Sequence, residues 1–279
     1  MDVSSLFNVQ GKAVLVTGGG KGIGRMISEG FVTNGARVYI SSRDGKACER
    51  AAAELTTLGK SSGSGGSAIA LPADLQSLDA CKALATSLAQ REPNGLHVLI
   101  NNSGAAWGEA FDTHPDHAWT KLLTLNLQRV FTLTQLLTPL LEKASRPAQS
   151  AADQAARRSD PARVINIGSI DALRVPSLEN YAYSASKAGL HQLSRTMALA
   201  LGPRGITVNT LACGPFPSKM MKAVLDSAGQ ELADANPLGR IGTPEDVAGA
   251  CLFLSGRAGA FVNGATLSID GGVHLLSKL

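Results

Sequence analysis

The sequence KAVLVTGGGKGIG, residues 12–24, decides how this chain folds. Residues 12–17 form a short apolar run rich in β-branched side chains, which is typical of a buried strand. A glycine-rich turn follows at once, and beyond it small and apolar residues recur at helical spacing, at Ile23, Met26, Ile27, Gly30 and Phe31. A strand, a glycine turn and a helix in direct succession predict the first unit of an α/β sheet.

The same alternation of short β-branched runs and longer helical patterns continues along the chain. Most runs lack polar alternation, which predicts strands covered on both faces, as in a parallel sheet. The predicted strands are 12–17, 37–42, 68–71, 97–101, 163–168, 206–211 and 265–269. We therefore expect a single Rossmann-type α/β domain over residues 1–279, with a doubly wound seven-stranded parallel sheet, helices on both faces and ligand sites at the carboxyl ends of the strands.

Two segments depart from this pattern. Residues 59–67 (GKSSGSGGS) contain too few apolar side chains to pack, which predicts a flexible surface insertion. Residues 145–161 are rich in Ala, Arg, Ser and Asp, and are expected to extend a long helix at 115–143 into a mobile loop. We expect both segments to be tolerated loops without a binding role.

The composition is that of an ordinary globular protein, with 44% of the 279 residues hydrophobic and 17% charged. The net charge of +4 comes without a Lys/Arg cluster, so no nucleic-acid partner is expected. No apolar run is long enough to span a membrane. Cys48, Cys81, Cys213 and Cys251 lack paired spacing, which predicts free thiols and no metal site. The N-terminus has no basic region before an apolar stretch, which argues against secretion.

The glycine turn between the first strand and the first helix predicts a dinucleotide site. Glycines allow the backbone to turn sharply and to approach a pyrophosphate, which then lies on the N–H groups that begin the helix. The residues expected to contact the cofactor here are Thr17, Gly18, Gly20, Lys21, Gly22, Ile23 and Gly24.

The end of the second predicted strand favours NADP(H) over NAD(H). An acidic side chain at this point would bind the ribose 2′-hydroxyl, but the chain has Ser42 and Arg43. Arg43 can bind a 2′-phosphate with two hydrogen bonds, and Lys21 adds a second positive charge. Asp44 is the one residue that argues the other way, although it lies one step past the strand.

Tyr183 and Lys187 lie four residues apart in the run YSASK, on one face of a predicted helix. A tyrosine is a poor proton donor and acceptor at neutral pH, but a lysine ammonium one turn away favours the phenolate and lowers the pKa of the phenol. Ser169 follows a predicted strand and can hydrogen-bond a substrate oxygen. Tyr181 has Ala185 at the corresponding position and therefore lacks the lysine. Together the three side chains predict hydride transfer to or from a carbonyl carbon.

With these motifs in this order, the chain resembles the short-chain dehydrogenase/reductase family over essentially its full length. The resemblance includes Asn101-Asn102-Ser103-Gly104 after the fourth strand, where the family usually has Asn-Asn-Ala-Gly. It implies cofactor contacts at Asn102 and Gly104, an adenine contact at Asp74 and Leu75, and further contacts of Tyr183 and Lys187 with the cofactor. It also implies that Asn126 holds a water that links the active-site lysine to solvent. From the residues alone, Asn126 could equally be a satisfied polar residue inside a helix.

Two further segments, 181–195 and 216–220, resemble the rhamnolipid-type branch of NADPH-dependent 3-oxoacyl reductases. The resemblance implies that Gly214 and Phe216 contact the cofactor. One departure is that Cys213 precedes Gly214, where the family usually has proline, and that Met221 stands near the usual threonine. Cys213 is expected to be a small packing residue, since no histidine lies near it in sequence.

Residues 215–235 correspond to the place where the family has its substrate lid. Their apolar side chains Phe216, Met220, Met221, Val224 and Leu225 would suit an acyl chain or a hydrophobic ketone. Trp107, beyond the fourth strand, is expected to form another wall of the cleft. The predicted substrate contacts are thus Trp107, Ser169, Tyr183, Phe216 and Met220, although lid residues that simply pack on the domain would show the same pattern.

Three functions fit these residues. The first is an NADPH-dependent carbonyl reductase that converts the ketone of a 3-oxoacyl or similar β-keto substrate into a secondary alcohol. The second is an NADP-linked alcohol or hydroxysteroid-type dehydrogenase with the same site. The third is a non-catalytic dinucleotide-binding regulator, which would not need an activated tyrosine.

The family resemblance implies a homotetramer, with a dimer as the second choice, built on the helices 115–143 and 182–201. The chain ends in Ser277-Lys278-Leu279, which is the tripeptide that directs proteins to peroxisomes. We therefore expect peroxisomal localisation through the import receptor for this tripeptide, with the cytoplasm as the alternative.

Overall fold

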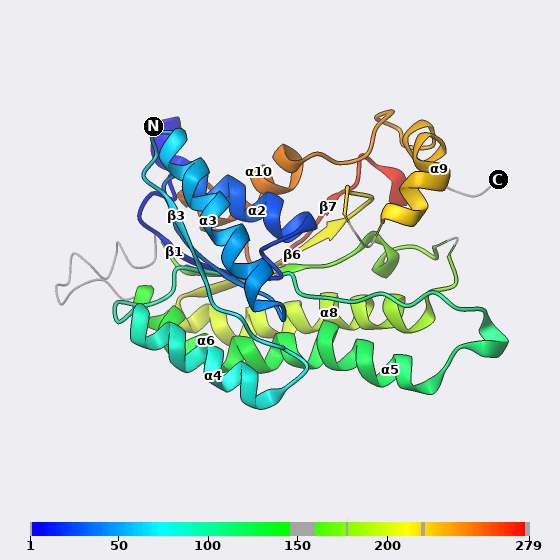
Figure 1. The fold of residues 1–279 in the computed structure, drawn as a ribbon, viewed down its shortest axis with the longest axis horizontal. Coiled ribbons are helices and arrows are strands. Elements are labelled where there is room, and N and C mark those ends of the chain that lie inside the picture. Colours follow the sequence, from blue (N-terminus) through cyan, green and yellow to red (C-terminus); the bar gives the residue numbers. More distant parts are fainter. Residues whose placement is uncertain (1, 146–159, 177, 219–220, 277–279) are drawn as a thin grey trace.

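The computed structural model describes residues 2–145, 160–176, 178–218 and 221–276. Seven parallel strands form one sheet in the order β3-β2-β1-β4-β5-β6-β7 (Figure 1). The strands are β1 (Ala13–Thr17), β2 (Arg37–Ser41), β3 (Ser67–Ala70), β4 (Val98–Asn101), β5 (Ala162–Ile167), β6 (Ile206–Cys213) and β7 (Thr266–Ile269). All seven strand predictions are confirmed, with ends that differ by at most two residues from those read in the sequence.

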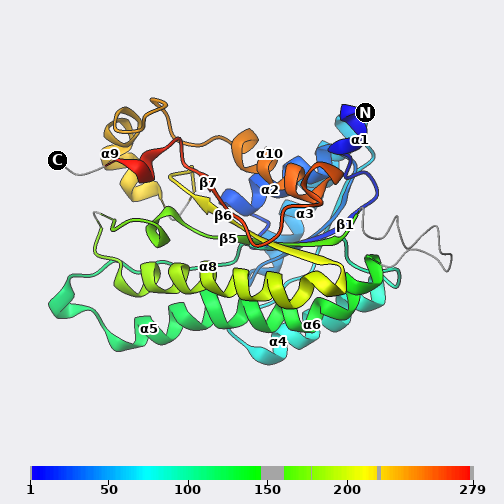
Figure 2. The same ribbon diagram turned by 180° about the vertical axis from the view of Figure 1, so that it is seen from behind.

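Helices cover both faces of the sheet (Figures 1 and 2). One face carries α2 (Gly22–Thr33), α3 (Gly45–Ser61) and α10 (Pro244–Ser255), and the other α4 (Leu78–Arg91), α5 (Asp116–Leu123), α6 (Arg129–Ala144) and α8 (Tyr181–Leu201). The short α1 (Val3–Leu6) lies near the N-terminus, and α9 (Lys222–Asp234) lies beyond the end of β6. The predicted doubly wound fold is therefore confirmed.

Successive side chains of the central strands enter two different cores. Val14 and Val16 belong to the core beneath α2, α3 and α10, whereas Ala13 and Leu15 belong to the core beneath α4, α6 and α8. All four side chains are fully buried. Because both faces of β1 are covered, its sequence is a continuous apolar run without polar alternation. This pattern is what predicted an interior strand.

The chain order reverses between β1 and β4. After β1 the chain runs outward through β2 and β3 and then returns to place β4 on the other side of β1. In such sheets ligands bind at the carboxyl ends of the strands where the order reverses. The ends of β1 and β4 therefore mark the expected position of the site.

Residues 59–67, predicted to be a flexible surface insertion, are partly occupied by regular secondary structure. The α3 helix continues to Ser61, and β3 begins at Ser67. Gly59 and Gly66 are buried, and a Cβ on either glycine would overlap with neighbouring backbone. The glycines of this segment thus allow a close approach between the end of α3 and the strand that follows.

The predicted helix 115–143 is present but is interrupted. A π-helical turn, Thr124–Gln128, joins α5 to α6. Most of the second predicted insertion, 145–161, lies outside the described residues.

The described residues contain no helix that is both long and apolar enough to cross a membrane. In the same part of the chain, no group of three or more His, Cys, Asp or Glu side chains is arranged to hold a metal ion. All four cysteines are free and buried.

Candidate active site

The glycine turn after β1 is held against the end of β4 by Thr17 and Asn102. The Thr17 hydroxyl accepts hydrogen bonds from the backbone N–H groups of Asn102 (2.9 Å) and Ser103 (3.0 Å). The Asn102 side chain in turn donates to the carbonyl of Thr17 at 2.8 Å. Gly18 has a φ of +67°, which few other residues adopt, and a Cβ on Gly24 would overlap with the Gly18 carbonyl. The turn therefore requires glycine at both positions.

The start of α2 has hydrogen-bond donors for an anion. Lys21 precedes the helix, and its side chain does not cap the first turn. The first N–H groups of a helix that is not capped attract a negatively charged ligand. The predicted pyrophosphate contacts, from Thr17 to Gly24, thus fit a dinucleotide by their backbone geometry.

Positive charge gathers at the neighbouring strand end. Thr17 and Ser41 are paired in the sheet, so Lys21 and Arg43 follow adjacent strands at the same edge. Both side chains are exposed and have no hydrogen-bond or ion-pair partner among the residues that the structure describes. Asp44, the one residue that argued against a 2′-phosphate, accepts from the N–H of Ala47 and caps α3. Its role at this helix end explains its presence.

Asp74 and Leu75 lie at the same edge of the sheet. The preceding residue, Ala73, donates its N–H to the carbonyl of Ser42 at 3.0 Å. The Asp74 carboxylate is exposed and accepts from the N–H of Gln76 at 3.1 Å, whereas Leu75 is buried. Leu75 can therefore take part in cofactor binding mainly through its backbone.

Ser169, Tyr183 and Lys187 meet at the carboxyl end of β5. Ser169 follows the strand, and its Oγ accepts from the N–H of Asp171 at 3.1 Å, so the hydroxyl can still donate its own proton. The Lys187 ammonium lies 5.7 Å from the centre of the Tyr183 ring and donates to the carbonyl of Ile167 at 2.8 Å. The three residues predicted to be catalytic are thus brought together by β5 and α8.

The expected lowering of the Tyr183 pKa by Lys187 is wrong for this structure. Burial raises the pKa of Tyr183 to about 12, against the opposing effect of a hydrogen bond with Ser169. Burial likewise lowers the pKa of Lys187 to about 8. Both groups lose water, which is the largest effect on each pKa, and the ammonium donates to the Ile167 carbonyl.

Asn126 lies in the π-helical turn and is 1% exposed. Its side chain donates to the carbonyl of Ala105 (2.9 Å) and to the Ser186 hydroxyl (3.0 Å), and it accepts from the N–H of Ala105 (3.0 Å). These bonds satisfy the amide within the protein. A Cβ on Gly104 would lie 3.3 Å from the Asn126 Oδ1 and 3.8 Å from the Lys187 Nζ. The lysine and the asparagine thus both lie beside Gly104, and the relay role of Asn126 stays a prediction.

The loop after β6 is tied to β7. The N–H of Gly214 donates to the carbonyl of Ile269 at 3.0 Å, and a Cβ on Gly214 would lie 2.7 Å from that of Asp270. Burial raises the pKa of the Cys213 thiol to about 12, so this thiol is unreactive at neutral pH.

Phe216 does not offer the open substrate surface that the sequence predicted. Its side chain is 1% exposed and packs so closely that a Cβ on Gly242 would overlap with the ring. It supports the loop from within the core, and it reaches ligands mainly through its backbone.

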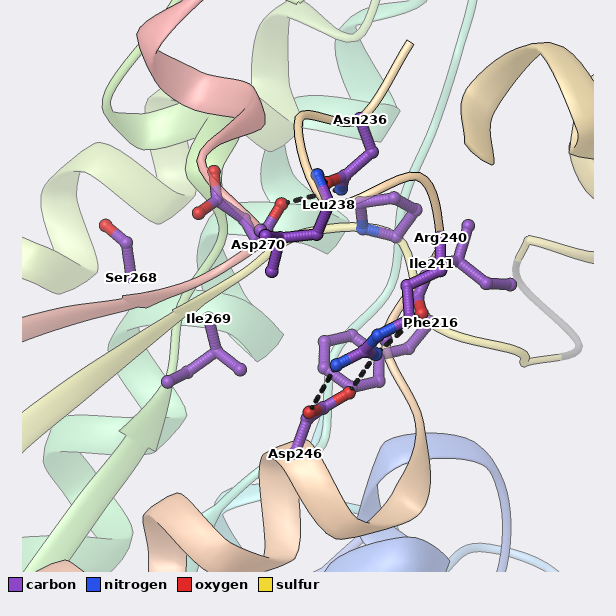
Figure 3. Close-up of a pocket in the computed structure, with 12 residues that line it drawn as sticks. Phe216, Asn236, Leu238, Arg240, Ile241, Asp246, Ser268, Ile269 and Asp270 are labelled. Carbon is purple, nitrogen blue, oxygen red and sulfur yellow. Dashed lines mark hydrogen bonds and ion pairs between the residues drawn. The ribbon is translucent and has the colours of Figure 1, made fainter. Parts of the chain in front are cut away.

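A pocket of about 240 Å³ lies beside this loop (Figure 3). It is lined by Pro215, Phe216, Asn236, Leu238, Arg240, Ile241, Gly242, Asp246, Ser268, Ile269, Asp270 and Gly271. None of the three catalytic candidates lines it, and several of its polar groups are already paired. Arg240 pairs with Asp246, and Asn236 donates to the carbonyl of Asp270 at 2.9 Å (Figure 3). We therefore place the chemistry at Ser169, Tyr183 and Lys187, and not in this pocket.

The structure places some of the remaining predicted substrate residues and not others. Trp107 packs edge-on against His117, and the Lys121 ammonium lies 5.2 Å from the centre of its ring, so α5 holds it. Met220 lies outside the described residues, as does the side chain of Val224. Tyr181 is exposed and donates to Glu179 at 2.9 Å, which agrees with its exclusion from the catalytic group.

Sequence reasoning missed exposed apolar side chains on the segment between Ser169 and α8. Leu173, Val175 and Leu178 are 46%, 88% and 56% exposed. It also missed His191, which is buried on α8 beneath Ser169. Neither feature has a sequence motif. The apolar residues that follow Ser169 could nevertheless have been predicted to lie beside the substrate, because they come directly after a catalytic serine.

Comparison with known proteins agrees with this geometry. A family model described as enoyl-(acyl carrier protein) reductase matches residues 18–274. The chain is 40% identical to the rhamnolipids biosynthesis 3-oxoacyl-(acyl-carrier-protein) reductase of Pseudomonas aeruginosa, over 96% of this chain and 98% of that protein. The solved Pseudomonas aeruginosa RhlG/NADP active-site complex is similar with a TM-score of 0.86 and 39% identity, over 97% of this chain and 99% of that one. A complex of 7α-hydroxysteroid dehydrogenase with NADH and 7-oxo glycochenodeoxycholic acid has a TM-score of 0.84 and 30% identity, over 98% of each chain. These matches extend over nearly the whole sequence, and the chain therefore belongs to the short-chain dehydrogenase/reductase family of oxidoreductases.

Proposed function

We propose that this enzyme uses NADPH to reduce the ketone of a 3-oxoacyl or similar β-keto compound to a secondary alcohol. The observation that carries the proposal is that Ser169, Tyr183 and Lys187 converge at the carboxyl end of β5, on the sheet edge that also carries the glycine turn. The relative from Pseudomonas aeruginosa is named a 3-oxoacyl reductase, which supports this substrate class.

NADPH bound along the glycine turn would supply the hydride. The Ser169 hydroxyl, whose Oγ already accepts from Asp171, donates to the carbonyl oxygen of the substrate and orients it. The Tyr183 hydroxyl gives its proton to the same oxygen as negative charge develops there. An alkoxide is a stronger base than a phenolate, so a tyrosine with a raised pKa still protonates it. The Lys187 ammonium lies over the ring and stabilises the phenolate that remains.

The surroundings of the site favour a hydrophobic substrate. Leu173, Val175 and Leu178 are exposed on the segment that joins Ser169 to α8. When an acyl chain or ring system covers exposed apolar side chains next to the catalytic groups, their removal from water lowers the free energy of the complex. The predicted lid, 215–235, would close over the other side of such a substrate.

A second function is an NADP-linked alcohol or hydroxysteroid-type dehydrogenase. The similarity to a 7α-hydroxysteroid dehydrogenase structure favours it, and the same three side chains serve either direction of the reaction. A non-catalytic regulator is the weakest alternative, because it would not need Ser169, Tyr183 and Lys187 in one place.

An activity screen separates these functions. NADPH oxidation would be followed at neutral pH with 3-oxoacyl thioesters, β-keto esters and steroid ketones, and NADP reduction with the matching alcohols. We expect the highest kcat/KM with a β-keto compound. A steroid preference would support the second function, and no turnover with any substrate would support the regulator.

Cofactor choice provides a direct prediction. Arg43→Ala is expected to raise the KM for NADPH about 10- to 100-fold, because a hydrogen-bonded charge pair contributes about 1.5–3 kcal/mol. The KM for NADH should change little, since NADH has no 2′-phosphate. Arg50→Ala, which removes an exposed arginine from the middle of α3, is the matched control. Equal effects of Arg43→Ala on both cofactors would show that Arg43 does not bind the phosphate.

We further propose a homotetramer, with a dimer as the second choice. Leu122 and Val130 are core residues, but Phe131 is 45% and Trp119 37% exposed on the same continuous helical segment. Exposed aromatic side chains on α5 and α6 support an interface there. A mass of one chain by light scattering at micromolar concentration would contradict both assemblies.

Peroxisomal import through Ser277-Lys278-Leu279 is also part of the proposal, with the cytoplasm as the alternative. These residues lie outside the described part of the chain, so the support is the sequence alone. A protein with a fluorescent N-terminal tag is expected to gather in peroxisomes, and the same protein without residues 277–279 should not. A diffuse signal from both proteins would exclude this localisation.

A further inference from the structure

His191 lies on α8 one helical turn after Lys187, so Tyr183, Lys187 and His191 share one face of the helix. The side chain is 3% exposed. Its ring fills the space beside Gly168, where a Cβ would overlap with Nε2 and would lie 2.8 Å from the Thr210 methyl group. The imidazole is therefore wedged between α8 and the ends of β5 and β6.

The ring contacts the backbone of Ser169. The N–H of Ser169 donates to His191 Nε2 at 3.4 Å. Two residues earlier, at the last residue of β5, the carbonyl of Ile167 accepts from the Lys187 ammonium at 2.8 Å. The α8 helix thus binds the chain on both sides of Gly168, with a donor at Lys187 and an acceptor at His191.

Only a neutral imidazole can make this contact. Burial, together with the nearby charges of Lys187 and Arg195, lowers the pKa of His191 to about 4. Because Nε2 accepts, the ring proton is on Nδ1, and Nδ1 has no hydrogen-bond partner among the described residues. A buried histidine with one unpaired nitrogen destabilises a fold more than an apolar side chain of similar size. Its presence here therefore calls for a function.

We propose that His191 is a positioning residue, which fixes the backbone of Ser169 so that the serine hydroxyl reaches the same substrate oxygen as Tyr183. This inference rests on the proposed function, since it assigns His191 to the Ser169 of that reaction. The serine backbone is then held by the same helix that carries the tyrosine and the lysine, so α8 helps to set the relative positions of all three.

Three substitutions of His191 test the proposal. His191→Leu removes the acceptor, and we expect kcat to fall about 10- to 100-fold, since a displacement of about 1 Å in an active site has effects of that size. The Oε1 of glutamine can take the place of Nε2, so His191→Gln should recover most of this loss. His191→Asn carries the same amide one carbon shorter and should not. The KM for NADPH and the affinity for NADPH, measured by fluorescence, should stay within about twofold in all three, because the glycine turn is untouched.

The ratio of kcat between His191→Gln and His191→Asn is the decisive measurement, since both variants place an amide in the same cavity. Equal kcat values for the two, or a kcat for His191→Leu equal to that of the wild type, would overturn the proposal. A rise in the KM for NADPH in parallel with the loss of kcat would also overturn it, because it would indicate a general disturbance of the fold.

Ser169→Ala distinguishes a failure of the proposed function from a failure of the positioning role of His191. If Ser169→Ala abolishes turnover and His191→Leu does not, the proposed function stands and only the role of His191 fails. If Ser169→Ala has no effect, both fail.

Discussion

Tyr183→Phe is expected to lower kcat by roughly 10²- to 10⁴-fold, the range for loss of a positioned general acid. The substitution removes only the hydroxyl that protonates the developing alkoxide, and it leaves the ring beneath Lys187 in place. Since the proton moves only as the hydride arrives, the loss falls on the chemical step, and the affinity for NADPH should change little. Single-turnover NADPH oxidation, together with NADPH binding by fluorescence, measures the two effects separately.

Tyr181→Phe is the matched control, because it removes the same hydroxyl two residues away. That hydroxyl is exposed and donates to Glu179, so kcat should stay close to that of the wild type. If Tyr181→Phe were the deleterious change, the assignment of Tyr183 would be wrong.

The sequence was sufficient for the centre of the sheet because β1, β4, β5 and β6 are buried on both faces. In β1, the consecutive residues Val14 and Leu15 enter opposite cores, so both faces of the strand are apolar. A continuous apolar run followed by a glycine turn therefore predicts both the strand and its place beside the switch point. The partnership of Tyr183 and Lys187 follows in the same way, from a helical spacing that brings the two side chains to one face.

Features that depend on tertiary contacts could not be predicted. The π-helical turn at Thr124–Gln128 has no residue pattern that distinguishes it from an α-helix, although it places Asn126 against Ala105 and Ser186. Residues 59–67 resemble a linker in composition, yet Gly59 and Gly66 are buried because the end of α3 and the start of β3 lie in close contact.

The pKa of Tyr183 was misjudged for a related reason. Spacing along a helix shows that a lysine is near, but it does not show how much water the two groups lose. In the structure, desolvation is the largest effect on both side chains, and Lys187 is bound to a backbone carbonyl as well. The prediction for Phe216 failed for the same reason. Its position after β6 was predicted correctly, but the burial of its side chain was not.

Lys187→Met is expected to abolish most turnover and also to stabilise the protein. The loss of the ammonium removes the group that stabilises the phenolate of Tyr183, so kcat should fall by about 10²- to 10⁴-fold. The gain in stability has a separate cause. Lys187 is 5% exposed, and burial lowers its pKa from 10.5 to about 8, which means that the folded state disfavours the charged form. A shift of this size corresponds to about 3 kcal/mol, from which the lost hydrogen bond to Ile167 subtracts about 1 kcal/mol.

The gain should depend on pH in a defined direction. Below pH 8 the lysine is charged in both states, and the wild type bears the full cost of burying the charge. Between pH 8 and 10.5 the folded state has lost the proton but the unfolded state still binds it, so the stability of the wild type rises with pH. The advantage of Lys187→Met in urea unfolding should therefore be greatest at neutral pH and shrink as the pH approaches 10.5.

Lys82→Met is the control for replacing a lysine by methionine, because Lys82 is exposed on α4, where its ammonium lies 3.6 Å from the carboxylate of Asp79. Its free energy of unfolding should change by less than about 0.5 kcal/mol at any pH. A Lys187→Met variant that is less stable than the wild type at pH 7 would show that the bond to Ile167 outweighs desolvation. In that case the lysine would be a structural support for β5, and its burial would not be a cost that catalysis requires. If instead the variant is both inactive and more stable, the active site holds a charge that the fold alone would exclude, and the function of the enzyme is the reason that it remains.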